Sequence, residues 1–261
     1  MQKKEKSEYM IQAVSHAFDL LELFSEKTPE IGIAQICKRL RISRPNVLRL
    51  IATLEPREFI EENKLTGNYR LGLKALELRT NFIRQMALLP QARPVLAVLA
   101  HDCDETCYVA VLKDFRCIYL DVVETPQVVR IVSRVGSRLP AHCTAAGKVQ
   151  LAYLPEEELE RFFATRELTR FTPKTITDQA AFKDHLRQIA AQGYAIDDEE
   201  LEEGVRGVAA PVRTYEDRVV GAIIISGPTM RISDERLRET LVPLVVKAAR
   251  EVSAKLGYAG K

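Results

Sequence analysis

Residues 31–54, IGIAQICKRLRISRPNVLRLIATL, decide how the N-terminal part of this chain folds. Apolar residues recur at helical spacing in each half of the stretch, which predicts two short helices separated by a break at residues 41–43. Ser43 is expected to cap the second helix with its side chain, and Pro45 fits the first turn of that helix, where its missing N–H costs nothing. Two short helices joined by a tight turn are typical of a helix-turn-helix.

The charge of this stretch has one sign. It contains five Lys or Arg residues and no Asp or Glu, whereas the whole chain has a formal net charge of only +2. Basic residues gathered on two short helices are typical of a surface that contacts phosphates. The second helix would enter the major groove of DNA, where Arg pairs with guanine and Asn with adenine. The alternative interpretation is a pair of solvated helices in an ordinary core.

The flanking sequence favours DNA binding. Residues 11–24 form an amphipathic pattern suited to a helix that backs the pair, and residues 59–63 and 69–71 read as strands around a turn that contains Gly67. This arrangement predicts a winged helix-turn-helix. The residues expected to contact DNA are Ser43, Arg44, Pro45, Asn46, Arg49 and Thr53 of the second helix, and Lys64 and Asn68 of the wing, with Tyr69 as a further wing residue.

Length and composition leave room for a second, larger domain. The chain has 261 residues, of which 46% are hydrophobic and 28% charged, as in a soluble, well-packed protein. No apolar run approaches the length of a membrane span, and the polar start, residues 1–6, lacks the apolar core of a signal peptide. A cytoplasmic location is therefore expected.

The second part of the chain mixes helices and strands. A helix is expected from Leu73 to about Leu89, ended by Pro90, as a connector or a dimer seam. Strands are then expected at residues 107–112, 117–123, 128–134, 194–197, 208–212 and 219–226, and helices at 95–101, 145–153, 156–163, 179–192 and 233–256. Antiparallel strands with helices on their faces predict an α+β fold.

One passage, residues 136–148, predicts an anion site. Thr144 or a neighbour is expected to cap a helix whose first turn consists of Ala145, Ala146 and Gly147. Free backbone N–H groups at such a helix start, near the positive end of its dipole, can hold a carboxylate. Small side chains would let the ligand approach closely.

Two further passages offer polar side chains at strand ends. Residues 193–200 place Asp197 and Asp198 where either could accept a hydrogen bond, and residues 221–228 form a buried strand in which the hydroxyl of Ser226 could face a pocket. An aspartate or serine in such a place is often only a turn residue.

Other functions are less well supported. Cys103 and Cys107 lie near His101 and Asp104 in the sequence, so a metal or redox sensor is one possible interpretation. The second ligand pair of a standard zinc site is missing, however. His142 and Cys143 suggest a Cys-dependent hydrolase, although adjacent residues of an extended strand point to opposite faces. Hydrolase, P-loop and dinucleotide-binding motifs are also missing, so neither catalysis nor a cofactor or bound metal is expected.

Four motifs, in this order behind a winged helix, resemble the IclR family of bacterial transcriptional regulators. They are LPAHCTAAGK at residues 139–148, GYAIDDEE at 193–200, GVRGVAAPV at 204–212 and ISGP at 225–228. The resemblance implies a winged helix-turn-helix at residues 8–72, a linker helix at 73–90 and a GAF-like α/β effector-binding domain with an antiparallel sheet at 91–258. Such proteins are homodimers or dimers of dimers, and they repress or activate genes of carbon-source breakdown through operator DNA.

The resemblance also implies an effector, typically a small organic acid. Its carboxylate would bind at Ala145, Ala146 and Gly147, and the other pocket positions match Asp197, Gly207, Ile224 and Ser226. Relatives that bind very small oxo-acids often have Cys in place of Gly207 and Ser in place of Ile224. A larger and more apolar pocket favours an aromatic acid over glyoxylate or pyruvate.

Overall fold

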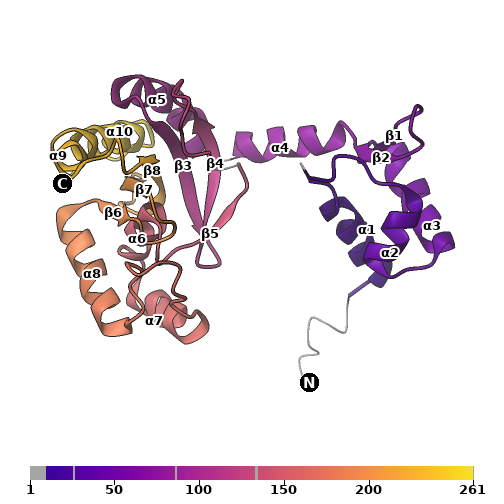
Figure 1. The fold of residues 1–261 in the computed structure, drawn as a ribbon, viewed down its shortest axis with the longest axis horizontal. Helices are drawn as coiled ribbons and strands as arrows, with labels where there is room; N and C mark the ends of the chain where they lie inside the picture. Colours follow the sequence, from indigo (N-terminus) through magenta and orange to yellow (C-terminus); the bar gives the residue numbers. More distant parts are fainter. Residues whose placement is uncertain (1–9, 26, 86, 133–134, 261) are drawn as a thin grey trace. The chain divides into compact units, whose positions relative to one another are not determined.

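The computed structural model describes residues 10–25, 27–85, 87–132 and 135–260. The chain divides into two compact units, Met1–Gln85 and Met86–Lys261, drawn in Figure 1. The predicted polar start and the end of the predicted strand, at residues 133–134, lie outside the described part. Within that part, no helix is both long enough and apolar enough to cross a membrane.

The first unit is a winged helix-turn-helix. Its elements are α1 (Gln12–Glu22), α2 (Ile33–Leu40), α3 (Arg44–Leu54), a 3-10 turn (Glu55–Arg57), β1 (Ile60–Glu62), β2 (Tyr69–Leu71) and α4 (Lys74–Gln85). Leu20, Ile36, Val47 and Ile51 are buried between the helices, which is the apolar pattern that the sequence predicted. The predicted architecture of this unit is confirmed.

Two local predictions in this unit are wrong. Ser43 stands at the N-cap of α3, but its side chain makes no capping hydrogen bond. Tyr69, predicted at the wing surface, is buried in the core, because β2 pairs with β1 and its backbone also bonds Ile31. The turn between the strands does depend on glycine, since Gly67 has a φ of +68°.

The second unit is built on one antiparallel sheet in the order β5-β4-β3-β8-β7-β6. Its strands are β3 (Thr106–Lys113), β4 (Arg116–Val123), β5 (Arg138–Pro140), β6 (Ala195–Asp198), β7 (Val205–Arg213) and β8 (Val219–Pro228). Its helices are α5 (Leu88–Cys103), α6 (Ala145–Leu151), α7 (Glu156–Thr165), α8 (Gln179–Gln192), α9 (Asp234–Arg236), a π-helical turn (Leu237–Leu241) and α10 (Val242–Lys255). The predicted α/β domain with an antiparallel sheet is confirmed.

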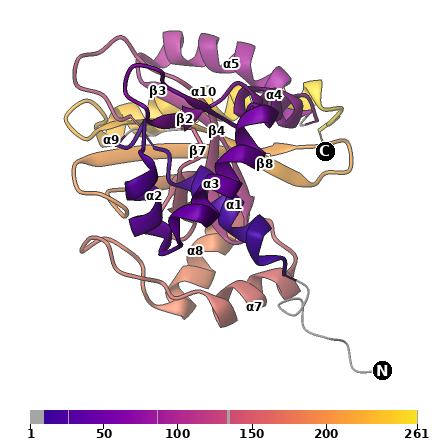
Figure 2. The same cartoon turned by 90° about the vertical axis from the view of Figure 1, so that its right-hand side faces the viewer.

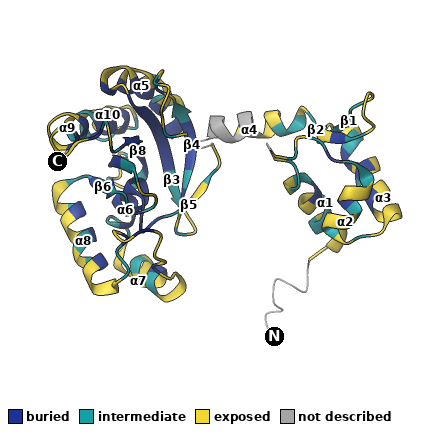
Figure 3. Cartoon of the chain, viewed as in Figure 1, coloured by how far each residue is buried: buried dark blue, intermediate teal, exposed yellow. Residues whose placement is uncertain are grey.

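Helices cover both faces of this sheet. Figure 1 shows α5 and α10 on one side and α6, α7 and α8 on the other, and Figure 2 shows α5 and α10 again on the opposite side from α7 and α8. Figure 3 shows the strands and α6 mainly as buried, whereas the outer helices keep exposed surfaces. All seven residues of α6 are buried, so this short helix lies inside the unit.

Two predictions about this unit fail for physical reasons. Pro90 does not end a helix but lies in the first turn of α5, where backbone N–H groups lack intrahelical partners and proline is tolerated. Residues 128–132 are apolar except for Arg130, but they form no strand: the strand that pairs with β4 at Arg116–Ile118 is β5. Val128 in this segment is 93% exposed.

Candidate DNA-contacting surface and acid-binding site

The outer surface of α3 carries the predicted DNA-contacting residues. Ser43, Arg44, Pro45, Asn46, Arg49 and Thr53 are all exposed. On the inner side Val47, Ile51 and Leu54 are buried. The Thr53 hydroxyl donates to the carbonyl oxygen of Arg49 at 2.8 Å. Within the described residues, the guanidinium groups of Arg44 and Arg49 have no hydrogen-bond or ion-pair partner, so both can reach DNA without first losing an internal contact.

The wing presents fewer free groups than predicted. Lys64 is exposed, but its ammonium pairs with Glu62 at 2.5 Å. Asn68 is half-buried, and a Cβ atom at Gly32 would lie 2.8 Å from its side-chain oxygen, so this amide packs against the start of α2. Leu65, which sequence reasoning missed, is 96% exposed at the tip of the turn.

In the second unit the sheet brings the predicted acid-site residues into one row. Asp197 of β6 pairs with Gly207 of β7, Gly207 pairs with Ser226 of β8, and Ser226 pairs with Thr106 of β3. Directly paired residues of antiparallel strands project from the same face of a sheet. Ile224 lies two residues before Ser226 and shares this face, where it packs in the same apolar cluster as Ala145 and Ala146 of α6.

The start of α6 matches the prediction except at Gly147, whose N–H is already hydrogen-bonded and is not a free donor. Thr144 caps the helix as predicted, because its hydroxyl oxygen accepts from the N–H of Gly147 at 3.2 Å. A Cβ atom at Gly147 would lie 2.3 Å from the backbone of Ala141, so this glycine is needed for close packing. Among the described residues, the N–H groups of Ala145 and Ala146 have no hydrogen-bond partner. Two free donors therefore remain in the first turn.

Asp197 and Asp198 have different surroundings because they point to opposite faces of β6. Asp198 is half-buried and forms ion pairs with Lys174 and Arg206. Asp197 is buried, and one of its carboxylate oxygens accepts from the N–H of Glu200 at 2.9 Å. Burial raises the pKa of Asp197 to about 7, against the charge of Lys148 and the hydrogen bond from Glu200, which lower it. The protonated and charged forms are thus both accessible near neutral pH.

Two tyrosines that were not predicted as site residues belong to the same cluster. Tyr108 of β3 and Tyr119 of β4 stack with their ring centroids 4.7 Å apart, and both pack with Ala145, Ala146 and Ile224. Burial raises the pKa of Tyr119 well above its usual range, and the nearby charge of Asp197 acts in the same direction. The available signal in the sequence was the two-residue period of β3, which places Tyr108 and Ala110 on the same face of the strand.

A buried ion pair links α6 to the segment that follows β6, next to this site. Lys148 of α6 is fully buried and binds the carboxylate of Glu200, which follows β6. The Lys148 ammonium also lies 3.3 Å from Nε2 of His185 on α8. Burial, followed by the Lys148 charge, lowers the pKa of His185 to about 4. The pair therefore ties the helix that offers N–H groups to the strand end that carries Asp197.

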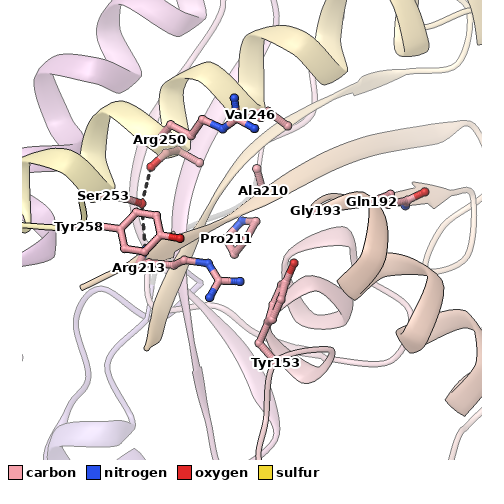
Figure 4. A pocket seen from close by; sticks show the side chains of 11 residues that line it. Tyr153, Gln192, Gly193, Ala210, Pro211, Arg213, Val246, Arg250, Ser253 and Tyr258 are labelled. Atoms are coloured by element: carbon pink, nitrogen blue, oxygen red, sulfur yellow. Dashed lines mark hydrogen bonds between the residues drawn. The ribbon is translucent and has the colours of Figure 1, made fainter. Parts of the chain in front are cut away.

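A separate cleft lies at the junction of β7 and α10, shown in Figure 4. It has a volume of about 200 Å³. The guanidinium of Arg213 stacks over the ring of Tyr153, 4.3 Å from its centroid, and donates to Asp217 at 2.7 Å. None of the predicted acid-site residues lines this cleft.

The geometry also bears on the alternative interpretations. Nε2 of His142 donates to the carbonyl oxygen of Thr169 at 2.9 Å, while the Cys143 thiol lies near the carbonyl oxygen of Pro140. Burial raises the pKa of Cys143 well above its usual range, the opposite of what activates a nucleophile. Among the described residues, no group of three or more His, Cys, Asp or Glu side chains is placed to hold a metal ion.

Comparison with known proteins agrees with both parts of this description. The IclR helix-turn-helix domain matches residues 13–64, and the family described as bacterial transcriptional regulator IclR C-terminal matches residues 80–254. The transcriptional regulator XynR of Escherichia coli (strain K12) is 35% identical over 95% of this chain and 98% of its own length.

Solved structures show the same fold. The crystal structure of Thermotoga maritima IclR has a TM-score of 0.83 and 29% identity, covering 95% of this chain and 100% of that one. The inducer-binding domain of a double mutant of PobR from Acinetobacter, in complex with 3-hydroxybenzoic acid, has a TM-score of 0.58 and 30% identity, covering 62% of this chain and 95% of that one. The chain belongs to the IclR family of bacterial transcriptional regulators.

Proposed function

We propose that this protein regulates a catabolic operon from the cytoplasm by binding operator DNA through residues 8–72 and a small aromatic carboxylic acid through residues 91–258. The observation that carries the proposal is the row Asp197–Gly207–Ser226, which shares a sheet face with the cluster formed by Ala145, Ala146 and Ile224. The predicted linker, residues 73–90, spans α4 and the first residues of α5.

The acid would lie with its carboxylate on the free N–H groups of Ala145 and Ala146. Two uncharged donors in a buried first turn compensate part of the charge that the carboxylate brings into the interior. Tyr108, Tyr119 and Ile224 would pack against an aromatic body. Asp197 and Ser226 would bond a ring hydroxyl. PobR, the relative whose inducer-binding domain was solved with 3-hydroxybenzoic acid, supports this class of ligand.

Thermal-shift titration tests the ligand class. We expect 3-hydroxybenzoate to raise the melting temperature, and pyruvate to leave it unchanged at the same concentrations. A ligand at 100 times its Kd adds about 2.7 kcal/mol to the stability of the form that binds it. Stabilisation by pyruvate and none by 3-hydroxybenzoate would contradict the proposal. Fluorescence anisotropy on the gene's own upstream DNA, with and without the acid, tests whether the same ligand changes operator affinity.

Ala145→Pro is expected to abolish stabilisation by the acid while leaving DNA binding intact. Ala145 is the first residue of α6, where proline is tolerated, and Thr144 before it is already extended, so the change chiefly deletes one N–H. The matched control is Gln179→Pro, at the first position of α8, which should keep the acid response. A variant that loses both acid response and DNA binding would indicate misfolding rather than loss of a donor.

Arg49→Ala is expected to weaken binding to the specific operator by about 1–3 kcal/mol if the guanidinium pairs with a base. Arg49 is exposed on α3, and its guanidinium has no partner among the described residues. The control Arg187→Ala removes an equally charged side chain from α8 of the other unit. Anisotropy at two salt concentrations measures both variants, and equal affinity of Arg49→Ala and wild type would remove Arg49 from the interface.

Assembly into homodimers or dimers of dimers completes the proposal. Ile11, at the N-cap of α1, and Val14 and Phe18 within the helix follow helical spacing and are exposed, so one side of the first unit carries an uncovered apolar stripe. A second copy of the chain would cover it. Paired DNA-binding units would then read two half-sites of one operator.

A further inference from the structure

Two cysteines lie in contact at the junction of α5 and β3. Cys103 is the last residue of α5 and Cys107 is the second residue of β3, and their Sγ atoms are 3.5 Å apart. Each thiol also lies 3.6 Å from the carbonyl oxygen of Glu105, which both face. Both cysteines are buried, and the residues on either side of Cys103, Asp102 and Asp104, are exposed.

We propose that Cys103 and Cys107 are a modification site, which hydroperoxides oxidise to an intramolecular disulfide. A disulfide bond is about 2.05 Å long, so the two sulfur atoms have to approach by about 1.5 Å. Asp104 and Glu105 form the short turn between α5 and β3, so only three residues separate the two cysteines in the chain. Among the described cysteines, no other pair is in contact.

Hydrogen peroxide serves as the oxidant; an organic hydroperoxide would release an alcohol in place of the first water. The Cys103 thiolate attacks one peroxide oxygen, so that an S–O bond forms, the O–O bond breaks and water leaves, giving a sulfenic acid. Cys107 then attacks the Cys103 sulfur, so that the S–S bond forms, the S–O bond breaks and a second water leaves. Hydrogen peroxide is reduced to water, and each cysteine loses its thiol hydrogen.

Local contacts make Cys103 the first thiol to react. The hydrogen bond from Cys107 lowers the pKa of Cys103, against burial and the charge of Glu105, which raise it, whereas burial raises the pKa of Cys107 and brings that of Cys117 to about 12. The guanidinium of Arg236 donates to the carbonyl oxygen of Cys103 at 2.6 Å and adds positive charge beside it. A thiolate is the reactive form, so oxidation starts where it forms most readily.

The turn that would contract holds a neighbouring loop. The Asp104 carboxylate accepts from the side-chain amide of Gln127 at 2.5 Å, and its carbonyl oxygen accepts from the Thr125 hydroxyl at 3.0 Å. The same loop continues to Ile131, whose carbonyl oxygen accepts from the hydroxyl of Tyr108 at 2.9 Å. Closing the disulfide shifts the groups that make these hydrogen bonds. Tyr108 contacts the acid in the proposed function, and on that basis oxidation alters the acid response.

Peroxide titration of the reduced full-length protein, followed by iodoacetamide and trypsin, tests the site. Residues 85–113 form one tryptic peptide with both cysteines, and residues 28–38 form another with only Cys37, which is partly exposed. We expect the first peptide to lose two hydrogen atoms and all alkylation before Cys37 is oxidised, and dithiothreitol to reverse the change. Full alkylation of residues 85–113 when Cys37 is already oxidised would overturn the proposal. This readout needs neither acid nor DNA, so it fails independently of the proposed function.

Matched variants identify the pair and its consequence. Cys107→Ser should leave a sulfenic acid on Cys103 that dimedone traps, with no loss of two hydrogens, whereas Cys117→Ser should form the disulfide as wild type does. Hydrogen exchange in residues 125–132 should become faster on oxidation of the wild type and remain unchanged in Cys107→Ser. Unchanged exchange in an oxidised wild type would refute the coupling to the loop.

Discussion

Lys148→Met is expected to lower the free energy of unfolding by about 3–5 kcal/mol, the usual effect of removing one partner of a buried ion pair. Lys148 is fully buried in α6, and its ammonium neutralises the Glu200 carboxylate. One oxygen of Glu200, Oε2, already has no hydrogen-bond partner within the described residues. Without the lysine, an unpaired carboxylate would remain in the interior. Urea unfolding followed by circular dichroism measures the loss.

A double variant separates loss of the pair from loss of packing. Lys148→Met combined with Glu200→Leu replaces both charges by apolar groups and should recover much of the stability lost in Lys148→Met alone. The backbone contacts of residue 200 with Asp197, Thr172 and Thr175 survive this change. A double variant as unstable as the sum of the two single variants would contradict the pairing argument.

The pKa of the His185 imidazole depends on the charge of Lys148. Burial and then the Lys148 charge lower the pKa of His185 to about 4. In Lys148→Met the second cause disappears, so an NMR titration should give a higher pKa for His185 while it stays below that of an exposed histidine. An unchanged value would mean that the Lys148 charge does not act on His185.

The helix-turn-helix could be predicted from sequence because its signals are local. The spacing of Val47, Ile51 and Leu54 defines the buried side of α3, and the exposed positions between them then follow from helical geometry. The wing was harder to predict, since Asn68 turns inward against Gly32 through a contact between residues far apart in the chain. Local patterns give an element's faces but not its tertiary neighbours.

The second unit shows where local signals end. Strand-end patterns pointed to Asp197 and Ser226 and the resemblance added Gly207, but their common row depends on the register of three strand pairs, which no local pattern encodes. The contact of Lys148 with Glu200 joins residues 52 apart. The apolar run at residues 128–132 failed as a strand because strand propensity supplies no pairing partner.

Glu105→Ala is expected to lower the free energy of unfolding by about 2–4 kcal/mol. Glu105 is fully buried before β3 and binds Arg231 through two hydrogen bonds, of 2.8 and 2.6 Å, and Arg236 at 3.0 Å. Its carboxylate therefore binds two arginines that follow it by 126 and 131 positions in the chain. The effect stays below that of a fully buried pair because the two arginines are 22% and 29% exposed and partly hydrated.

A surface pair in the same unit provides the control. Glu124 pairs with Arg130 at 2.7 Å, but both side chains reach solvent, so Glu124→Ala should cost about 1 kcal/mol or less. Each variant loses one glutamate, so the difference between their free energies of unfolding, measured in urea, reports the effect of burial rather than of charge. Equal losses would show that Glu105 contributes no more than a surface ion pair. We expect the larger loss for Glu105→Ala, because the two arginines that it holds also donate to backbone carbonyl oxygens, Arg236 to that of Cys103 and Arg231 to that of Val129.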